Sequence, residues 1–405
     1  MADRNVTPDP CLLQQIFKDS QPKNISMFVQ TWDKCVFKAE FSKDESVHPS
    51  CVVRIEAENK NLTTFATTAA MQQIARIIIP HLVPQTLQIG KATNEQKKLF
   101  NFSVSELVDG PTLADVWHDL DDIERNLIIN DLTDALIRLN ALQLNDGPIK
   151  AILLNSLGGG EEEEIWKGLA RGDVFGGLHT GVLNEGPALL TSIMENLKLK
   201  KTFCTMETLP NSQDVKIQSN FDELGSLIVR KSDMDQWLRE AVFCHNDLTP
   251  RNLILKKWDL PGGKKKYKLA GIIDWESAGF YPPSYELSLQ DTYLGRDRHA
   301  SFYLMLKANM KELAPRTSSQ IALLKAMELM YESQQRRLVN GTNVPAHLRQ
   351  RFLECLGLTR DDDPYAGWTP ERKEGKIVDF SSTAMQRLKD DIVQEMEERR
   401  KSKAK

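Results

Sequence analysis

The residues of this chain that could carry out chemistry lie in two short motifs, each at the end of an apolar run. In the first motif one residue separates His245 from Asp247, and Asn252 follows Asp247 after four more. In the second, the apolar run 269–273 ends in Asp274. A nucleoside triphosphate needs a divalent cation to neutralise its phosphate oxygens, and an attacking hydroxyl needs a group that orients it and accepts its proton. Because the side-chain oxygens of the two motifs can meet both needs, the pattern predicts phosphoryl transfer.

Each of these residues has an expected role in that reaction. Asp247 would accept or steer the proton of the acceptor hydroxyl, whereas Asn252 and Asp274 would hold Mg²⁺ against the phosphates of ATP or another nucleoside triphosphate. His245 is expected to orient the loop rather than to act as the base. The spacing is that of the kinase catalytic loop, and Asp274 takes the place of the metal-binding Asp of Asp-Phe-Gly. Turn capping is the alternative for each residue alone, but their joint occurrence favours the catalytic interpretation.

The amino-acid sequences of both motifs resemble those of a known superfamily. Residues 245–252 read His-Asn-Asp-Leu-Thr-Pro-Arg-Asn, and residues 272–282 read Ile-Ile-Asp-Trp-Glu-Ser-Ala-Gly-Phe-Tyr-Pro. This is similar to the aminoglycoside phosphotransferase and choline kinase superfamily of small-molecule kinases, and most similar to its branch in filamentous fungi. The resemblance covers roughly residues 45 to 290. It implies an α+β, two-lobed protein-kinase-like fold with a small β-rich N-lobe before Gly110 and a larger, mainly helical C-lobe after it.

The chain is expected to divide into four parts around these motifs. Three short β-type runs, at 25–29, 35–41 and 51–55, are typical of antiparallel strands that open a small lobe. The expected parts are an N-terminal extension (1–24), the N-lobe and hinge for the nucleotide (25–110), the C-lobe with the catalytic loops and substrate pocket (111–360), and a C-terminal tail with an amphipathic charged helix (361–405).

Three further positions are expected to contact the nucleotide. Arg54 stands where the third-strand lysine of a kinase would lie, and there it would neutralise phosphate charge, although an outward-facing strand arginine is the alternative. The apolar run 99–106 leads into Gly110 and resembles the hinge between the lobes. That resemblance implies that the Glu106 carbonyl and the Val108 amide face the adenine edge.

Two departures from the kinase pattern point to a second hypothesis. The turn 30–34, where glycines would cover the phosphates, contains none, and the following helix has Thr67 or Thr68 where a glutamate would pair with the third-strand cation. Glu56 or Glu58 could substitute for that glutamate. The departures leave open a kinase-fold nucleotide-binding protein with little or no catalysis, a pseudokinase. A protein kinase is disfavoured, because the sequence leaves no room for an activation segment after the second motif.

Composition narrows the class of function. The 405-residue chain has a formal net charge of −4, which argues against nucleic acid as a partner, and it lacks the run of about 18 apolar residues that a membrane span needs. Its polar start lacks the apolar core of a signal peptide, and its six cysteines show no metal-site spacing, so we expect a cytoplasmic enzyme with reduced thiols. The partner would be a small-molecule hydroxyl acceptor. Its identity stays open, although the acidic run within 158–164, expected to be an exposed segment, could attract an amine.

Overall fold

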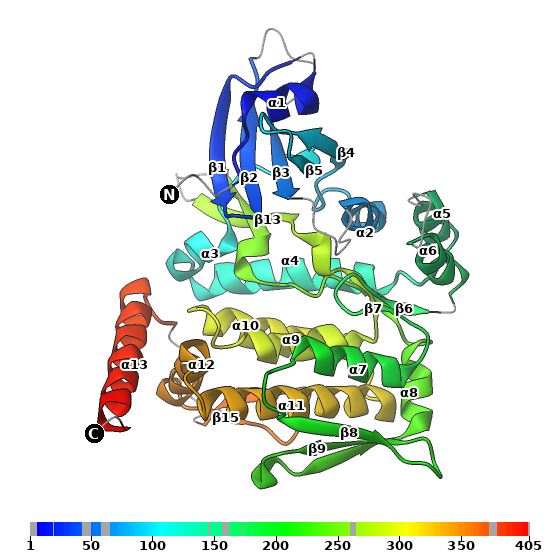
Figure 1. The fold of residues 1–405 in the computed structure, drawn as a ribbon, viewed down its shortest axis with the longest axis vertical. Coiled ribbons are helices and arrows are strands. Elements are labelled where there is room, and N and C mark those ends of the chain that lie inside the picture. The colour runs from blue at the N-terminus through cyan, green and yellow to red at the C-terminus, as the bar shows by residue number, and fades with distance from the viewer. Residues whose placement is uncertain are drawn as a thin grey trace.

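The small lobe is built on an antiparallel sheet of five strands in the order β1-β2-β3-β5-β4 (Figure 1). The computed structural model describes residues 6–18, 20–42, 50–57, 65–144, 146–155, 162–172, 174–259, 265–371 and 379–403. The strands of this sheet are β1 (Asn24–Gln30), β2 (Lys34–Glu40), β3 (Cys51–Ala57), β4 (Thr86–Thr93) and β5 (Leu99–Glu106).

The two faces of this sheet differ because β2 and β3 alternate between buried and partly exposed residues. Cys35, Phe37 and Val53 point into the core of the small lobe. Helix α1 (Pro10–Phe17) covers that core with Leu12 and Ile16, and its first turn is capped by an aspartate side chain. The opposite face carries the partly exposed positions, among them Arg54, whose side chain reaches Asp274 in the large lobe.

Helix α2 (Phe65–Ile78) joins the lobes, since its buried residues Met71, Ile74 and Ala75 belong to the core of the large lobe. The chain crosses between the lobes after β5. Gly110 has φ +148°, and a Cβ at this position would lie 1.9 Å from the carbonyl oxygen of Leu255. This crossing therefore requires glycine.

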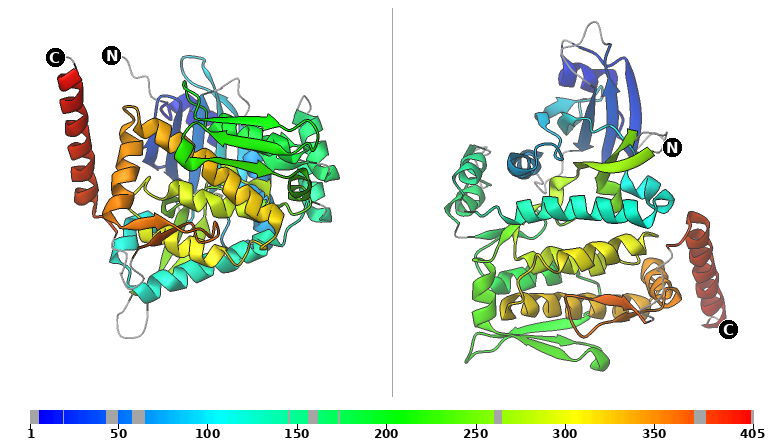
Figure 2. Two further views of the ribbon diagram at one scale, coloured as in Figure 1. Left: turned by 90° about the horizontal axis from the view of Figure 1, so that it is seen from below. Right: turned by 180° about the vertical axis from the view of Figure 1, so that it is seen from behind.

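The large lobe is mainly helical and lies in layers below the sheet (Figures 1 and 2). Helix α4 runs beneath the small lobe, α9 and α10 lie under α4, and α11 lies under them. A capping box begins α4, and a stripe of buried apolar residues packs it into the core. The helices are α3 (Leu113–Val116), α4 (Asp122–Asn140), α5 (Gly147–Asn155), α6 (Glu162–Arg171), α7 (Gly186–Asn196), α8 (Lys231–Trp237), α9 (Pro283–Tyr293), α10 (Ala300–Met310), α11 (Ser318–Val339), α12 (Val344–Cys355) and α13 (Ser382–Lys403).

Short strands complete the large lobe in four small sheets, ordered β11-β14-β6-β7, β10-β9-β8, β12-β13 and β15-β16. They are β6 (Phe175–Gly177), β7 (Gly181–Leu183), β8 (Cys204–Thr208), β9 (Val215–Ser219), β10 (Ser226–Val229), β11 (Val242–Cys244), β12 (Leu253–Asp259), β13 (Lys265–Ile272), β14 (Gly279–Tyr281), β15 (Leu358–Arg360) and β16 (Trp368–Pro370). The region 145–230, which shows little pattern in the sequence, thus contains three helices and five strands among its described residues. The segment 158–164 was expected to be exposed. Residues 158–161 lie outside the described residues, and residues 162–164 form the start of α6.

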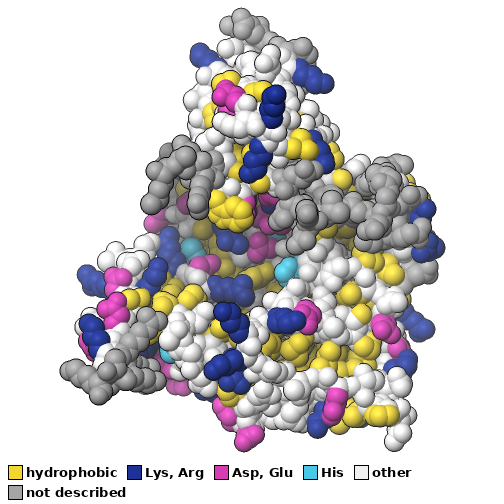
Figure 3. Space-filling view, in the orientation of Figure 1, with side chains coloured by type: hydrophobic (Ala, Val, Ile, Leu, Met, Phe, Trp, Pro, Cys, Tyr) yellow, Lys and Arg dark blue, Asp and Glu magenta, His cyan; other side chains and the backbone are white. Residues whose placement is uncertain are grey.

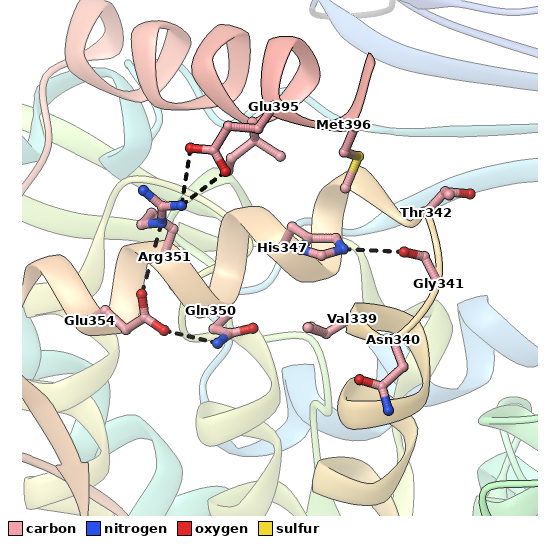
Figure 4. Close-up of a pocket in the computed structure, with 11 residues that line it drawn as sticks. Val339, Asn340, Gly341, Thr342, His347, Gln350, Arg351, Glu354, Glu395 and Met396 are labelled. Carbon is pink, nitrogen blue, oxygen red and sulfur yellow. Dashed lines mark hydrogen bonds and ion pairs between the residues drawn. The ribbon is translucent and has the colours of Figure 1, made fainter. Parts of the chain in front are cut away.

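The predicted two-lobed α+β fold is confirmed. The helices of the described ranges include none that is long and apolar enough to cross a membrane. All six cysteines are free in the structure. A cavity of about 590 Å³ lies between α12 and α13, where Arg351 pairs with Glu395 at 3.2 Å (Figure 4). No residue of either motif lines this cavity, so it is separate from the hollow between the lobes, where charged side chains gather (Figure 3).

Candidate active site

The first motif forms a loop whose shape depends on His245. Strand β11 leads into this loop, and the next residue, Asn246, turns the chain with φ +63°. The backbone N–H of Asp247 donates to His245 Nδ1 at 3.1 Å, so Nε2 carries the proton and donates to the carbonyl of Ile273 at 3.0 Å. Burial lowers the pKa of His245 and keeps the ring neutral at pH 7. His245 therefore links the two motifs and orients the loop, as predicted.

A buried carboxylate from α9 supports the same loop from below. Glu286 is 2% exposed and accepts the backbone N–H groups of His245 at 2.8 Å and Asn246 at 2.6 Å. Burial raises the pKa of Glu286 to about 7, although both N–H donors act in the opposite direction. The hydroxyl of Tyr293 donates to the Asn246 carbonyl at 2.6 Å. Hydrogen bonds from both ends of α9 thus hold the loop, and Glu286 acts as a structural acceptor.

Asp247 and Asn252 are in direct contact. The Asn252 side-chain amide donates to Asp247 Oδ2 at 2.8 Å and to the Asp247 carbonyl at 2.9 Å. The short 3-10 helix Pro250–Asn252 makes this contact possible by folding the chain back over five residues. Because the amide nitrogen is engaged, Asn252 Oδ1 faces away from Asp247, and it accepts no hydrogen bond from the described residues. This oxygen is available as a ligand.

The second motif is brought beside the first by the β12–β13 hairpin. Leu253 pairs with Ile272 in the hairpin, and the N–H of Ile273 donates to the carbonyl of Asn252 at 2.9 Å. Asp274 follows at once in the left-handed conformation, with φ 66° and ψ 58°. Burial and the neighbouring Glu276 raise the pKa of Asp274 to about 6, and the charge of Asp247 acts in the same direction. The hairpin therefore returns Asn252 and Asp274 to the same edge.

Arg54 reaches from the centre of β3 into the second motif. Its Nη1 lies 3.5 Å from Asp274 Oδ1, and its Nη2 lies 2.5 Å from both Glu276 Oε2 and Glu56 Oε1. Thr67, one of the two threonines expected at the helix position that normally carries the pairing glutamate, is buried in α2. Glu56 was one of two residues named as a substitute, and the other, Glu58, lies outside the described residues.

Sequence reasoning missed Glu276 as a partner of Arg54. The two residues are 222 positions apart, so no local pattern connects them. The sequence signal that could have indicated Glu276 was the tripeptide Asp-Trp-Glu, which places a second carboxylate two residues after Asp274.

The two hinge residues lie on the segment that joins the lobes, Glu106 as the last residue of β5 and Val108 two residues later. The Glu106 carboxylate pairs with Arg76 at 3.2 Å and accepts the N–H of Gln85 at 2.8 Å. The Val108 side chain packs against Gly271 of β13, where a Cβ would lie 2.8 Å from Val108 Cγ1. Val108 therefore closes the space between the hinge and the hairpin.

The donor set fits a hard divalent cation. Asp274 offers a carboxylate and Asn252 a free amide oxygen, with Asp247 beside them, and Mg²⁺ prefers such oxygen ligands. The described residues hold no group of three or more His, Cys, Asp or Glu side chains that could bind a metal without other ligands. Mg²⁺ sites of this kind use one or two carboxylates together with the phosphates of the substrate. Phosphate oxygens would therefore have to complete the coordination.

Two lobes joined by a hinge, with two polar loops meeting below a strand arginine, define a kinase-like phosphotransferase. The chain belongs to the phosphotransferase enzyme family (APH), whose model matches residues 44–315 and so includes both motifs. No curated protein matches the sequence significantly.

Solved structures of aminoglycoside phosphotransferases are similar to the chain. A thermostable mutant of aminoglycoside phosphotransferase APH(4)-Ia, in ternary complex with AMP-PNP and hygromycin B, is 14% identical with a TM-score of 0.46, and the match covers 86% of this chain and 97% of that one. Aminoglycoside 2'-phosphotransferase-IIIa in complex with GDP is 14% identical with a TM-score of 0.40, over 95% and 97% of the two chains.

Proposed function

We propose that the protein transfers the γ-phosphoryl group of ATP, or of another nucleoside triphosphate, to a hydroxyl group of a small molecule in a Mg²⁺-dependent reaction. The observation that carries this proposal is the 2.8 Å contact between the Asp247 carboxylate and the Asn252 amide, with Asp274 beside them. A turn cap would need only one of these side chains. Their convergence supports a site for phosphate, metal and acceptor together.

The residues divide the work between the two substrates. Asp247 Oδ2 is fixed by Asn252, which leaves the carboxylate oriented to accept the proton of the acceptor hydroxyl. Asn252 Oδ1 and the Asp274 carboxylate would hold Mg²⁺, which neutralises phosphate charge when bound. Arg54 would approach the phosphates from the small lobe, and the backbone of the hinge at Glu106 and Val108 would contact the base. Positioning and electrostatic stabilisation would supply most of the acceleration.

A nucleotide-binding protein without catalysis is the competing proposal. It was motivated partly by the missing helix glutamate, but Glu56 and Glu276 pair with Arg54 in its stead. Binding alone also gives no reason to hold Asp247 on the acceptor side of the site. We infer that the geometry favours catalysis.

The test is transfer of labelled γ-phosphate from ATP to a broad metabolite extract, with the unaltered protein and the Asp247→Ala variant. We expect the variant to lose about 10²–10⁴-fold in transfer, the usual contribution of a general base, while its nucleotide affinity stays within about twofold. Asp235→Ala is the matched control, because Asp235 is exposed on α8 and pairs only with Lys231 among the described residues. Loss of ATP binding without loss of turnover per bound complex would contradict the role of Asp247. Metal-independent nucleotide binding with no transfer would favour the binding protein.

A further inference from the structure

The turn between β1 and β2 engages two of its backbone amides internally. The N–H of Thr31 donates to the Lys34 carbonyl at 2.8 Å, and the N–H of Lys34 donates to Thr31 Oγ1 at 3.2 Å. The Thr31 hydroxyl in turn donates to Asp33 Oδ1 at 2.6 Å. A glycine-rich turn covers phosphates with free amides. Here the amides of Thr31 and Lys34 are already engaged, so this turn offers the phosphates fewer free amides than a glycine-rich turn would.

Lys34 lies on the same face of the sheet as Arg54, the face from which side chains reach the hollow between the lobes. In the β2–β3 ladder it is directly opposite Glu56, and Val36 is opposite Arg54. Residues paired across a ladder share a face, as do residues two apart on one strand. Arg54 defines which face this is, because it reaches Asp274. The Lys34 side chain is therefore on the same side as Arg54, at the end of the strand next to the turn.

The ammonium group of Lys34 has no carboxylate within 4 Å among the described residues, because its neighbours are engaged elsewhere. The carboxylate of Glu56 is taken by Arg54 at 2.5 Å, and that of Asp33 by Thr31. Glu56, which lies opposite Lys34 in the ladder, pairs with Arg54, and Arg54 in turn contacts Asp274 and Glu276 of the second motif. Lys38, on the same face of the same strand, is paired with Glu40 at 2.5 Å. Lys34 is thus a cation on the same sheet face as the Arg54–Glu56 pair, and no ion pair within the described residues engages it.

The charge of Arg54 cannot serve the phosphates alone. Its guanidinium already contacts Glu56, Glu276 and Asp274, three carboxylates around one cation. A triphosphate entering this site adds further negative charge, and a lysine suits it as a compact cation on a flexible stem.

We propose that Lys34 binds the polyphosphate of the nucleoside triphosphate from the small lobe, in the role that backbone amides have in a glycine-rich turn. This rests on the proposed function, since it assigns one more residue to the same nucleotide site. The lysine would contact the β- and γ-phosphates and not the base, because it lies at the turn end of the strand, away from the hinge.

The experiment compares the affinities of ATP and AMP for the unaltered protein, Lys34→Met and Lys38→Met, with Mg²⁺ in excess and at fixed ionic strength. Lys38→Met removes the same charge from the same face four residues along, about 13 Å away at 3.3 Å per residue. We expect Lys34→Met to weaken ATP binding about tenfold, as for the loss of one charge-assisted hydrogen bond, and to leave AMP binding within about twofold. Lys38→Met should change neither affinity by more than about twofold, and Lys34→Arg should restore most of the ATP affinity.

Two results would overturn the assignment. One is unchanged ATP affinity in Lys34→Met, and the other is an equal loss for AMP and ATP, since that would place the effect on the base or on the sheet. A thermal melt checks that each variant is folded. If Lys34→Met does not fold, Lys34→Gln takes its place. If the unaltered protein binds no nucleotide, the proposed function itself is contradicted. If the unaltered protein binds ATP and Lys34→Met binds it equally well, only the role of Lys34 is contradicted.

Discussion

The substitution Glu286→Gln measures how much the buried charge beneath the catalytic loop lowers the free energy of unfolding. The carboxylate accepts two backbone N–H groups of the loop, and a glutamine carbonyl oxygen can accept the same two. The replacement therefore keeps the hydrogen bonds and the volume but removes the titration. Glu286 is 2% exposed, so solvent screens little of the effect.

The magnitude follows from the displaced pKa. Burial moves the pKa of Glu286 from 4.5 to about 7, which corresponds to about 3 kcal/mol at about 1.36 kcal/mol per pKa unit. The raised pKa means that the folded protein binds this proton more tightly than the unfolded chain does. Stability contributed by Glu286 is therefore full below pH 4.5 and falls as pH rises toward 7. Glutamine has no such slope, so the variant should gain on the unaltered protein by up to about 3 kcal/mol between pH 4.5 and pH 8.

Urea unfolding at several pH values across that window measures this difference, with unchanged m-values as the condition for comparing free energies. Other titrating groups cancel in the difference between the two proteins, because they are common to both. Glu207→Gln, at an exposed position on β8, is the matched control for the exchange of glutamate for glutamine. We also expect Glu286→Gln to retain phosphotransfer, since the loop keeps its support. A difference between the two proteins that stays constant with pH would refute the raised pKa of Glu286.

Two other substitutions test the metal site and the crossing between the lobes. Asp274→Ala should raise the Mg²⁺ concentration needed for half-maximal transfer sharply, and an unchanged Mg²⁺ titration would remove Asp274 from the metal site. Gly110→Ala should destabilise the fold by at least about 1–3 kcal/mol, the cost of a strained backbone alone, because the new Cβ would also collide with the Leu255 carbonyl. Gly147→Ala, where nothing lies within 4 Å of the added Cβ, is the control in urea unfolding, and equal losses in both variants would contradict this explanation.

The parts of the site that are local in sequence were predictable. The first motif places Asp247 and Asn252 within one short loop, so their spacing alone brings the side chains together. The hairpin then returns Asp274 to the same place, and its strands are readable as apolar runs on either side of a Pro-Gly-Gly turn. Short-range geometry and the need for oxygen ligands were sufficient for this half of the site.

The small-lobe half was less accessible because it depends on pairing between distant strands. Strand alternation predicted that Arg54 faces one side of the sheet, but not which side. Its contact with Glu276 joins residues 222 positions apart, and only the folded chain shows it. The sequence gives no signal for Lys34 either, because a lysine beside a turn is ordinarily solvated. In the region 145–230, strands as short as β6 and β7 leave too few residues for a period to be read.

The charges around the cleft connect the two proposals. Asp247, Asp274, Glu276 and Glu56 meet there, and Arg54 alone pairs with three of them. Burial raises the pKa of Asp274, and the charges of Glu276 and Asp247 raise it further. A triphosphate is drawn into such surroundings only with added positive charge, which Mg²⁺ would supply from the large lobe and Lys34 from the small lobe. The missing glycine turn is then no sign of lost catalysis, because a side chain can cover the phosphates where backbone amides do not.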